Sequence, residues 1–498
     1  MKSASSSVLP APRLQAIAWC VLSLLGLSGC ASFEGIHSEQ HLAQPADFAV
    51  ETSLGKHAGA GQWPSVNWVE QFGDPQLTAL IAEAMQNNPS LQQAQARLAA
   101  ASAVAEGKGA PLLPNISADA GITRNLFSST TIYPAPYGGS WFNEKSAFVS
   151  LNYELDLWGK NTAALAQAVS QSKAAAADAQ ETRLVLASSI AATYNQLATE
   201  YALHEVLTRT LAQREALQKL TVERLRSGLD TQIERTQSQG SSADARAQLA
   251  QSEAQITLTR QQLGSLLGKG PDRGLQITAP HMAVLRTPAL PEQLPLNLLG
   301  RRPDIVAARW QVEAASKDIE ASKARFYPDI NLSAMAGFDS LLNANPFTSA
   351  SKSIALGPAI SLPIFEGGAL RAHLKGAYAG YDLAVATYNQ TLNQAYSDVA
   401  TQLTGISAID RELPIRREAL AAAQRGYDLA QERYRIGLSS QLPALNAETT
   451  LLSQQQQLIN LEASRRHQQI GLFKALGGGF DAQQAGLAMA GPNGAPAQ

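Results

Sequence analysis

Few side chains in this sequence could do chemistry, and their spacing does not match a catalytic site. Cys20 and Cys30 both lie within the first thirty residues, which excludes a disulfide framework or a cysteine-rich metal site from the rest of the chain. The sequence has no GxSxG nucleophile elbow, no phosphate-binding glycine loop and no HExxH zinc motif. The methionines beyond the first residue do not cluster: Met85, Met282, Met335 and Met489. We therefore expect no catalytic residue, no metal site and no bound cofactor.

The first thirty residues are typical of an export signal that ends at one reactive residue. Positive charge precedes an apolar run at residues 14–27, which is too short to cross a bilayer. The stretch that follows, residues 27–31 (LSGCA), resembles a bacterial lipobox. This resemblance implies cleavage before Cys30, a covalent lipid on that residue and, because Ala31 is not aspartate, delivery to the outer membrane. An ordinary secretory signal with a coincidental cysteine and an uncleaved anchor are the alternatives.

The overall composition narrows the class of protein. Charged residues make up 16% of the 498, below the ~25% of an average soluble chain, and the net charge is −2. A nucleic-acid-binding protein needs a basic excess that this chain lacks, so we expect no nucleic-acid partner. After the signal there is no run of about eighteen apolar residues. Any further membrane crossing must therefore be made by strands.

The chain contains two copies of one pattern. Three pairs of matching positions mark the copies: Pro89 and Pro303, Pro114 and Pro328, and Gly228 and Gly437. The proline pairs are both 214 residues apart and the glycine pair is 209 apart, so the first copy has the longer segment between them. Insertions are tolerated in exposed loops, where we place this one. Such a repeat predicts one structural unit used twice.

Each copy predicts a helix, two strands, a long helix, a turn and a returning helix. Alternation of apolar and polar residues predicts four strands at residues 115–123, 149–157, 330–338 and 354–364. Each has about the length that a tilted strand needs to cross hydrocarbon. Long surface loops are expected between the paired strands, at residues 125–144 and 341–352. A soluble two-sheet domain would show the same alternation and stays as an alternative.

The long helices are equally clear. Residues 160–227 contain no proline and are rich in alanine, glutamine and leucine, which favours one continuous helix. Ile190 and Tyr194 begin a seam with steps of 4, 3 and 4, and residues 392–406 repeat this coiled-coil spacing. We expect Pro414 to bend or break the helix of the second copy.

Four strands cannot close a sheet in lipid by themselves. The two edges would leave backbone N–H and C=O groups unpaired, at several kcal/mol each, so other copies must complete the sheet. Two chains would give eight strands and three would give twelve, and this arithmetic permits either number.

Six motifs, in order, resemble one family. They are residues 72–77 (FGDPQL), 155–159 (LDLWG), 301–304 (RRPD), 326–328 (FYP), 363–368 (PIFEGG) and 475–479 (ALGGG). The chain resembles an outer-membrane efflux lipoprotein of the TolC/OprM (NodT) family over essentially its whole mature length. The resemblance implies an α+β membrane protein: a homotrimer with a 12-stranded outer-membrane β-barrel, four strands per chain. A long α-helical periplasmic barrel with a mixed equatorial region would continue it.

On this basis the chain divides into six parts. They are the lipoprotein signal peptide (1–29), an N-terminal anchor and equatorial segment (30–74), the first repeat (75–268), an equatorial linker (269–300), the second repeat (301–477) and a C-terminal tail (478–498).

The resemblance also implies a function. The chain would be the lipid-anchored outer-membrane channel of a tripartite efflux system, passively conducting small molecules. An inner-membrane pump of the RND or major-facilitator type and a periplasmic adaptor would deliver them. The alternatives are a type I protein-secretion outlet, a periplasmic coiled-coil lipoprotein without a channel, and an enzyme on a helical stalk.

Two sets of residues would carry this function. In the family, the helical turns contact the adaptor, and here the turn residues are Arg226, Gly228, Leu229, Arg435, Gly437 and Leu438. An ordinary helical hairpin is the alternative. The positions of the family's periplasmic aperture are Gln237, Arg433, Tyr434, Leu442 and Asn446. Because the family's acid, nine residues beyond the turn glycine, is Asn446 here and Gln237 in the first copy, we expect a ring of Asn446 and Leu442. We expect inter-helix links from Arg433 and Arg435.

Overall fold

A computed structural model describes residues 33–54, 61–130, 132, 134–285, 294–341 and 345–489. The predicted signal peptide and Cys30 lie outside these residues, as does the tail after 489. Among the residues described, no helix is both long enough and apolar enough to cross a membrane. Contacts divide the chain into two units, which we describe separately. Unit 1 contains residues 33–41, 100–172 and 310–386, and unit 2 contains residues 42–99, 173–309 and 387–489.

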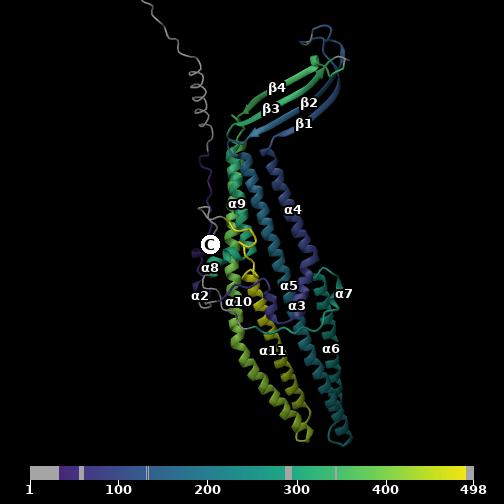
Figure 1. The fold of residues 1–498 in the computed structure, drawn as a ribbon. Helices are drawn as coiled ribbons and strands as arrows, with labels where there is room; N and C mark the ends of the chain where they lie inside the picture. Colours follow the sequence, from purple (N-terminus) through teal and green to yellow (C-terminus); the bar gives the residue numbers. More distant parts are fainter. Residues whose placement is uncertain are drawn as a thin grey trace, which may run out of the picture. The chain divides into compact units, whose positions relative to one another are not determined.

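The predicted order of elements is present twice (Figure 1). Before the first strand lie η1 (Pro45–Asp47), α2 (Glu51–Leu54), η3 (Trp68–Phe72), α3 (Pro75–Asn87), α4 (Pro89–Gly109) and η4 (Ala110–Leu112). The first copy continues with β1 (Asn115–Leu126), β2 (Trp141–Leu155), α5 (Lys160–Arg226) and α6 (Gln232–Leu266), followed by α7 (Pro271–Gly274) and α8 (Leu294–Arg301). The second copy comprises α9 (Pro303–Ala324), β3 (Asp329–Ser340), η5 (Ser349–Ser351), β4 (Lys352–Ser361), α10 (Ala369–Arg435) and α11 (Leu442–Ala475).

All four strands lie in unit 1 and form one antiparallel sheet in the order β1-β2-β3-β4 (Figure 1). Residues directly opposite in the register share a face, so the pairing defines two faces. One face is apolar and includes Ile116, Ala118, Val149, Leu151, Leu332, Ala334, Ala336, Ile354, Leu356 and Ile360. The other is mainly polar and includes Asn115, Ser117, Asp119, Ser150, Asn152, Glu154, Asn331, Ser333 and Asp339.

The apolar face of the sheet is open in the single chain. Ile116 is 67% exposed and Leu356 is 83% exposed, values typical of surface polar residues rather than of core strands. β1 and β4 each pair on one side only, so both edges of the sheet are also unpaired. The four strands predicted from alternation are confirmed, and among the described residues no layer covers their apolar face.

The strand ends differ from the prediction for local reasons. β2 begins at Trp141, so the first loop is shorter than residues 125–144. Leu157 lies beyond β2, because the Asp156 carboxylate accepts hydrogen bonds from the backbone N–H of Asn161 (3.0 Å) and Thr162 (2.7 Å) and so starts α5. β4 ends at Ser361, two residues before a proline that has no N–H to donate.

The first long helix matches its predicted limits closely. α5 spans Lys160–Arg226, against a prediction of 160–227, and its seam residues Ile190 and Tyr194 are fully buried. The helix does not break at Pro414, because α10 continues through it, and the bend at this residue stays a prediction. Ile406, Ile409 and Leu413 are buried on one side of this stretch, and their packing outweighs the one backbone hydrogen bond that proline removes.

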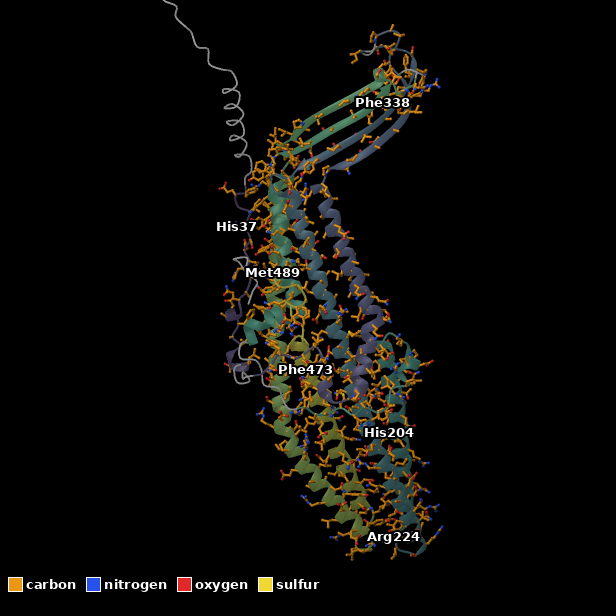
Figure 2. The ribbon with its side chains drawn as sticks, viewed as in Figure 1. His37, His204, Arg224, Phe338, Phe473 and Met489 are labelled. Atoms are coloured by element: carbon orange, nitrogen blue, oxygen red, sulfur yellow. The ribbon has the colours of Figure 1, made fainter. Side chains whose placement is uncertain are left out.

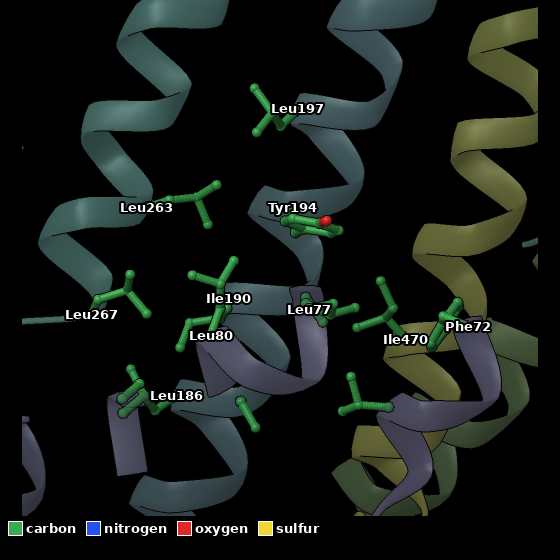
Figure 3. Close-up of a cluster of buried hydrophobic side chains, with 14 of the residues drawn as sticks. Phe72, Leu77, Leu80, Leu186, Ile190, Tyr194, Leu197, Leu263, Leu267 and Ile470 are labelled. Atoms are coloured by element: carbon green, nitrogen blue, oxygen red, sulfur yellow. The ribbon is translucent and has the colours of Figure 1, made fainter. Parts of the chain in front are cut away.

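Unit 2 contains the main core. Trp68, Phe72 and Phe473 pack ring against ring, with Trp68 and Phe473 stacked at 5.2 Å between ring centroids. Aliphatic residues of α3, α5 and α6 extend this cluster, as Figure 3 shows for Leu77, Leu80, Ile190, Leu263 and Leu267. This core fixes how the helices of unit 2 lie against one another, and so positions the turns at their ends.

Residues 33–43 form an arm without helix or strand, and its contacts are given for each unit separately. In unit 1, Phe33 makes an edge-to-face contact with Phe326 (5.2 Å), and the Ser38 hydroxyl donates to Asp382 (2.6 Å). In unit 2, the backbone N–H of Ala43 donates to Asn389 Oδ1 at 2.8 Å. Side chains and backbone of this arm are therefore held by specific contacts within each unit.

Candidate functional site

The two helical turns have the same backbone design. Gly228 and Gly437 have φ values of 75° and 80°, the left-handed region that favours glycine. In the first turn, the N–H of Leu229 donates to Arg224 O (2.9 Å), and that of Gly228 to Leu225 O (3.1 Å). Equivalent bonds run from Leu438 and Gly437 to Arg433 and Tyr434, with donor–acceptor distances of 2.8 and 3.1 Å. Both helices thus end in a Schellman motif.

The side chains of these turns face solvent. Leu229 is 64% exposed and Leu438 is 67% exposed. In a Schellman motif this position usually packs back on its own helix, so its exposure here is unusual. Arg226 and Arg435 are exposed as well. The predicted turn residues are therefore together and accessible at two equivalent turns, while their contact with an adaptor stays a prediction.

Tyr434 is not exposed. Its side chain is fully buried, and its hydroxyl donates to Asp230 Oδ2 at 2.7 Å and lies 3.1 Å from Thr221 Oγ1. Burial, together with the hydrogen bond to Asp230, raises the pKa of Tyr434 to about 12. In this chain Tyr434 connects α10 to α5 instead of lining an opening.

The same cluster contains a buried arginine that none of the sequence motifs indicates. Arg224 Nε lies 3.1 Å from Asp230 Oδ2, and Arg224 Nη1 donates to Tyr434 O at 3.1 Å. Its guanidinium carbon is 4.6 Å from the centroid of the Tyr434 ring. Arg224 lies close to the turn at the end of α5, as Figure 2 shows. The contacts join the first helical hairpin to the end of α10.

A difference between the two copies could have revealed this cluster. Thr231, the residue after Asp230, is the N-cap of α6 and forms a capping box with Glu234. Asp230 is thereby free to bind Arg224. At the repeat spacing of 209 the second copy has Ser439 in place of Asp230 and Arg433 in place of Arg224, and Arg433 is exposed. The sequence signal for this cluster is therefore an acidic residue, Asp230, that is present in the first copy and absent from the second.

A second buried ion pair lies farther from the turns. Arg214 Nε of α5 is 3.2 Å from Glu448 Oε2 of α11, and both side chains are less than a tenth exposed. Arg214 also donates to Ser241 O of α6 at 3.0 Å. Burial raises the pKa of Glu448, while Arg214 opposes the rise. Glu448, two residues after the predicted aperture residue Asn446, therefore faces the chain's own helices.

The other predicted aperture residues are exposed. They are Gln237, Arg433, Leu442 and Asn446. The predicted inter-helix link from Arg435 is absent within the described chain, because Arg435 pairs with Glu432 of its own helix at 2.7 Å. Gln237, Leu442 and Asn446 follow the turns in the chain and Arg433 precedes its turn, and the predicted ring of these side chains would need neighbouring chains.

Several of the recurring motifs turn out to be structural. The Asp74 carboxylate caps α3 and accepts a 2.7 Å bond from the Tyr194 hydroxyl. Buried Arg302 pairs with Asp304 (2.7 Å) and Asp398 (3.2 Å). The glycines at 477–479 permit close packing, since a Cβ on Gly477 would lie 1.8 Å from a backbone oxygen. These residues hold unit 2 together.

The junction between strands and helices in unit 1 is also structural. Trp158 Nε1 donates to Pro328 O at 2.8 Å, and its ring stacks on Tyr327 at 4.9 Å. Lys160 bridges Glu154 (2.7 Å) and Asp329 (2.8 Å). Both copies of the repeat are thereby joined where β2 ends and β3 begins.

The described residues contain no group of three or more histidine, cysteine or carboxylate side chains that could hold a metal. His37 and His41 are four residues apart, but their segment is not helical, so the spacing does not place them on one helix face.

Comparison with known proteins gives consistent matches. The family model described as "Outer membrane efflux protein" matches residues 80–269 and 294–478. The chain is 36% identical over 373 residues to the fusaric acid resistance protein FusA of Burkholderia cepacia, covering 73% of this chain and 69% of FusA. It is 32% identical to the pyoverdine export outer membrane protein OpmQ of Pseudomonas aeruginosa, covering 84% of this chain and 89% of OpmQ. The crystal structure of the outer membrane protein VceC of Vibrio cholerae superposes with a TM-score of 0.79 at 36% identity, covering 84% of this chain and all of VceC.

Proposed function

This chain belongs to the outer membrane efflux protein family, and from that premise we propose that three copies of it form one continuous export duct. Family membership makes the chain an outer-membrane channel for efflux. We propose further that four strands per copy close a twelve-stranded barrel in the membrane. The long helices would form a periplasmic helical barrel, with the mixed equatorial region around it.

The observation that carries this proposal is the two-faced, open-edged sheet. An apolar face exposed over all four strands suits lipid, and a mainly polar opposite face suits a water-filled lumen. The unpaired edges at β1 and β4 would each cost several kcal/mol per free backbone group in hydrocarbon, so they must pair with other copies. Eight strands would give a barrel filled by side chains, whereas twelve leave space for passage.

The polar face would set the charge of the lumen. Asp119 and Glu154 lie on it, and carboxylates that line a wide pore favour cations. Serine and asparagine are as frequent on this face, so the selectivity would be weak. Passage through such a lumen needs no catalytic group, so we propose a passive duct and no enzyme activity.

The N-terminal arm supports lipidation of Cys30. Phe33 packs on Phe326, three residues before β3 begins, and Lys323 Nζ lies 5.8 Å from the Phe33 ring centroid. Cys30 precedes Phe33 by three residues, a length of chain that can span at most about 10 Å. A lipid on Cys30 would therefore enter the membrane beside the helical end of the strands, where a barrel of this kind meets the inner leaflet.

The exposed turns support a periplasmic partner. We propose that Leu229 and Leu438 of each copy contact a periplasmic adaptor, which would connect the duct to an inner-membrane pump of the RND or major-facilitator type. Gln237, Arg433, Leu442 and Asn446 would lie at the periplasmic aperture. The cargo would be small molecules, the class that the names of FusA and OpmQ indicate for those proteins.

Arginine substitutions at two neighbouring strand residues test the barrel. Leu151 lies on the apolar face and Ser150 on the polar face of the same strand. In a barrel, Leu151→Arg places a charge in lipid at a cost of about 2–4 kcal/mol per copy, while Ser150→Arg faces water. We expect Leu151→Arg to reduce trimer yield and channel conductance in planar bilayers, with Ser150→Arg close to wild type. Equal tolerance of both, or a wild-type chain that stays monomeric without detergent, would refute the proposal.

A further inference from the structure

Charges on the four strands separate completely by face. The acidic residues all lie on the polar face: Asp119, Glu144, Glu154, Asp329 and Asp339. The basic residues all lie on the apolar face: Arg124, Lys145 and Lys352. A solvated sheet has no reason to sort charge in this way. The environment of the apolar face, which carries the basic residues, must therefore differ from that of the polar face.

The three basic residues, which we call the basic row, gather at one end of the strands. In the register, the apolar face runs along β2 from Leu155 to Ala147, a length of about 26 Å, before it reaches Lys145. Arg124 lies opposite Asn143, and Lys352 lies opposite Phe338. This is the end that carries the two loops, away from the helices, where Figure 2 labels Phe338.

The row crosses the sheet obliquely. From Arg124 on β1 to Lys352 on β4 the register shifts by four residues, about 13 Å along the strands, over three strand spacings of about 14 Å. The resulting inclination of about 40° lies within the 35–45° by which barrel strands tilt. The basic row therefore fits a single height along the axis of a barrel with tilted strands. This height lies near the loop end of the apolar face.

The charges of the basic row have no acidic partner among the described residues. Within the parts of the chain that are described, no ion pair involves a residue of the basic row. Arg124 and Lys352 are exposed, and Arg124 lies over the Trp141 ring at 5.4 Å from its centroid. A tryptophan beside an arginine is typical of a membrane boundary, where a flat ring and a charged head meet lipid headgroups.

We propose that Arg124, Lys145 and Lys352 form a binding surface for the phosphate groups of anionic membrane lipid at the loop-side boundary of the bilayer. The inference rests on the proposed barrel, since only then does this face meet lipid. A cation that faces hydrocarbon is costly at the centre of a bilayer but not at its boundary, where lipid phosphates complement it. Lysine binds phosphate as a point charge and arginine binds it through two parallel N–H bonds. Three copies would repeat the surface around the barrel.

The test compares lipid binding by the purified trimer with and without the basic row. The variant Arg124→Gln, Lys145→Gln, Lys352→Gln removes the row. The matched control Lys219→Gln, Arg246→Gln, Arg425→Gln removes the same charge from exposed helical positions. Each protein is reconstituted into phosphatidylcholine vesicles that contain lipid A, in either its diphosphorylated or its dephosphorylated form. Native mass spectrometry then counts the lipid A retained after detergent extraction, and channel conductance confirms insertion.

We expect wild type and control to retain the diphosphorylated lipid preferentially. The row variant should insert normally but lose the preference, with an apparent affinity about tenfold lower or more. Equal retention of both lipids by wild type, or unchanged retention by the row variant, would overturn the lipid-binding proposal and leave the barrel intact. A wild-type chain that fails to conduct in vesicles would refute the barrel itself, and the lipid-binding surface with it.

Discussion

The hydroxyl of Tyr434 donates a 2.7 Å hydrogen bond to Asp230, a residue 204 positions earlier in the chain. Tyr434 lies in the last turn of α10, and Asp230 follows α5, so this bond joins the ends of the two long helices. Arg224 contacts both partners and leaves neither exposed. The first hairpin is thus connected to the second close to the exposed turns. The charge of Asp230 can be changed by substitution and the protonation of Tyr434 by pH, so each contribution can be tested separately.

Asp230→Asn should loosen both turns. The change removes the carboxylate that faces Arg224, whose side chain is only 10% exposed, and leaves that charge buried without its partner. Breaking a buried pair in this way costs about 3–5 kcal/mol. We expect faster amide hydrogen exchange in residues 224–238 and 430–441, measured on the detergent-solubilised trimer, with exchange in the core of unit 2 unchanged.

Asp244→Asn is the matched control for that substitution. Asp244 lies 3.4 Å from Arg214 but its side chain is 61% exposed, so its loss should cost less than about 1 kcal/mol. Comparable exchange in the two variants would mean that the Asp230 contact does not hold the turns.

Alkaline pH should weaken the same contact. Tyr434 is buried and bonded to Asp230, which raises its pKa to about 12 from an ordinary value near 10. Between these pH values an unfolded tyrosine loses its proton while Tyr434 keeps it, so the free energy of unfolding falls as pH rises. The fall attributable to Tyr434 is at most about 2–3 kcal/mol. Tyr434→Phe should show a shallower pH dependence in denaturant titrations from pH 9 to 12. An unchanged slope would contradict this account.

Gly477→Ala should disrupt the packing of unit 2. The residue has a φ of 83°, and an added Cβ would lie 1.8 Å from Arg301 O, so both the backbone and the neighbour must shift. We expect a loss of about 3 kcal/mol or more, seen as a lower thermal unfolding midpoint of the trimer. Gly426→Ala, inside α10 with open space around it, should be neutral or gain up to about 1 kcal/mol. Similar midpoints for the two variants would argue against close packing at Gly477.

Features set by local preferences were predictable from the sequence. The long helix ends at Arg226, one residue from its predicted limit, because the segment lacks proline and is followed by Gly228 in the left-handed region. The strands were visible because one face must be apolar and the other polar. The exact ends of the strands depend on single side-chain contacts, such as the cap that Asp156 provides for α5. The alternation of apolar and polar residues does not indicate such contacts.

Features set by distant contacts were not predictable. Tyr434 was assigned to the aperture, yet Thr221, Arg224 and Asp230 enclose it, and nothing local places those residues beside α10. The break expected at Pro414 failed for a similar reason, because buried neighbours such as Leu413 maintain the helix around it. A single-residue difference between the two copies carries more information about such contacts than the motifs that the copies share.

The exposed turn leucines should decide partner binding rather than assembly. Leu229→Asp combined with Leu438→Asp replaces two exposed apolar side chains by charges without altering the glycine turns or the buried cluster behind them. We expect trimers of normal thermal stability, but loss of efflux when the variant replaces wild type in a deletion strain exposed to a panel of toxic small molecules. Leu229→Met with Leu438→Met keeps an apolar surface and should retain efflux. If the aspartate variant exports as well as the methionine variant, the turns are not the adaptor contact and function only as the ends of two hairpins.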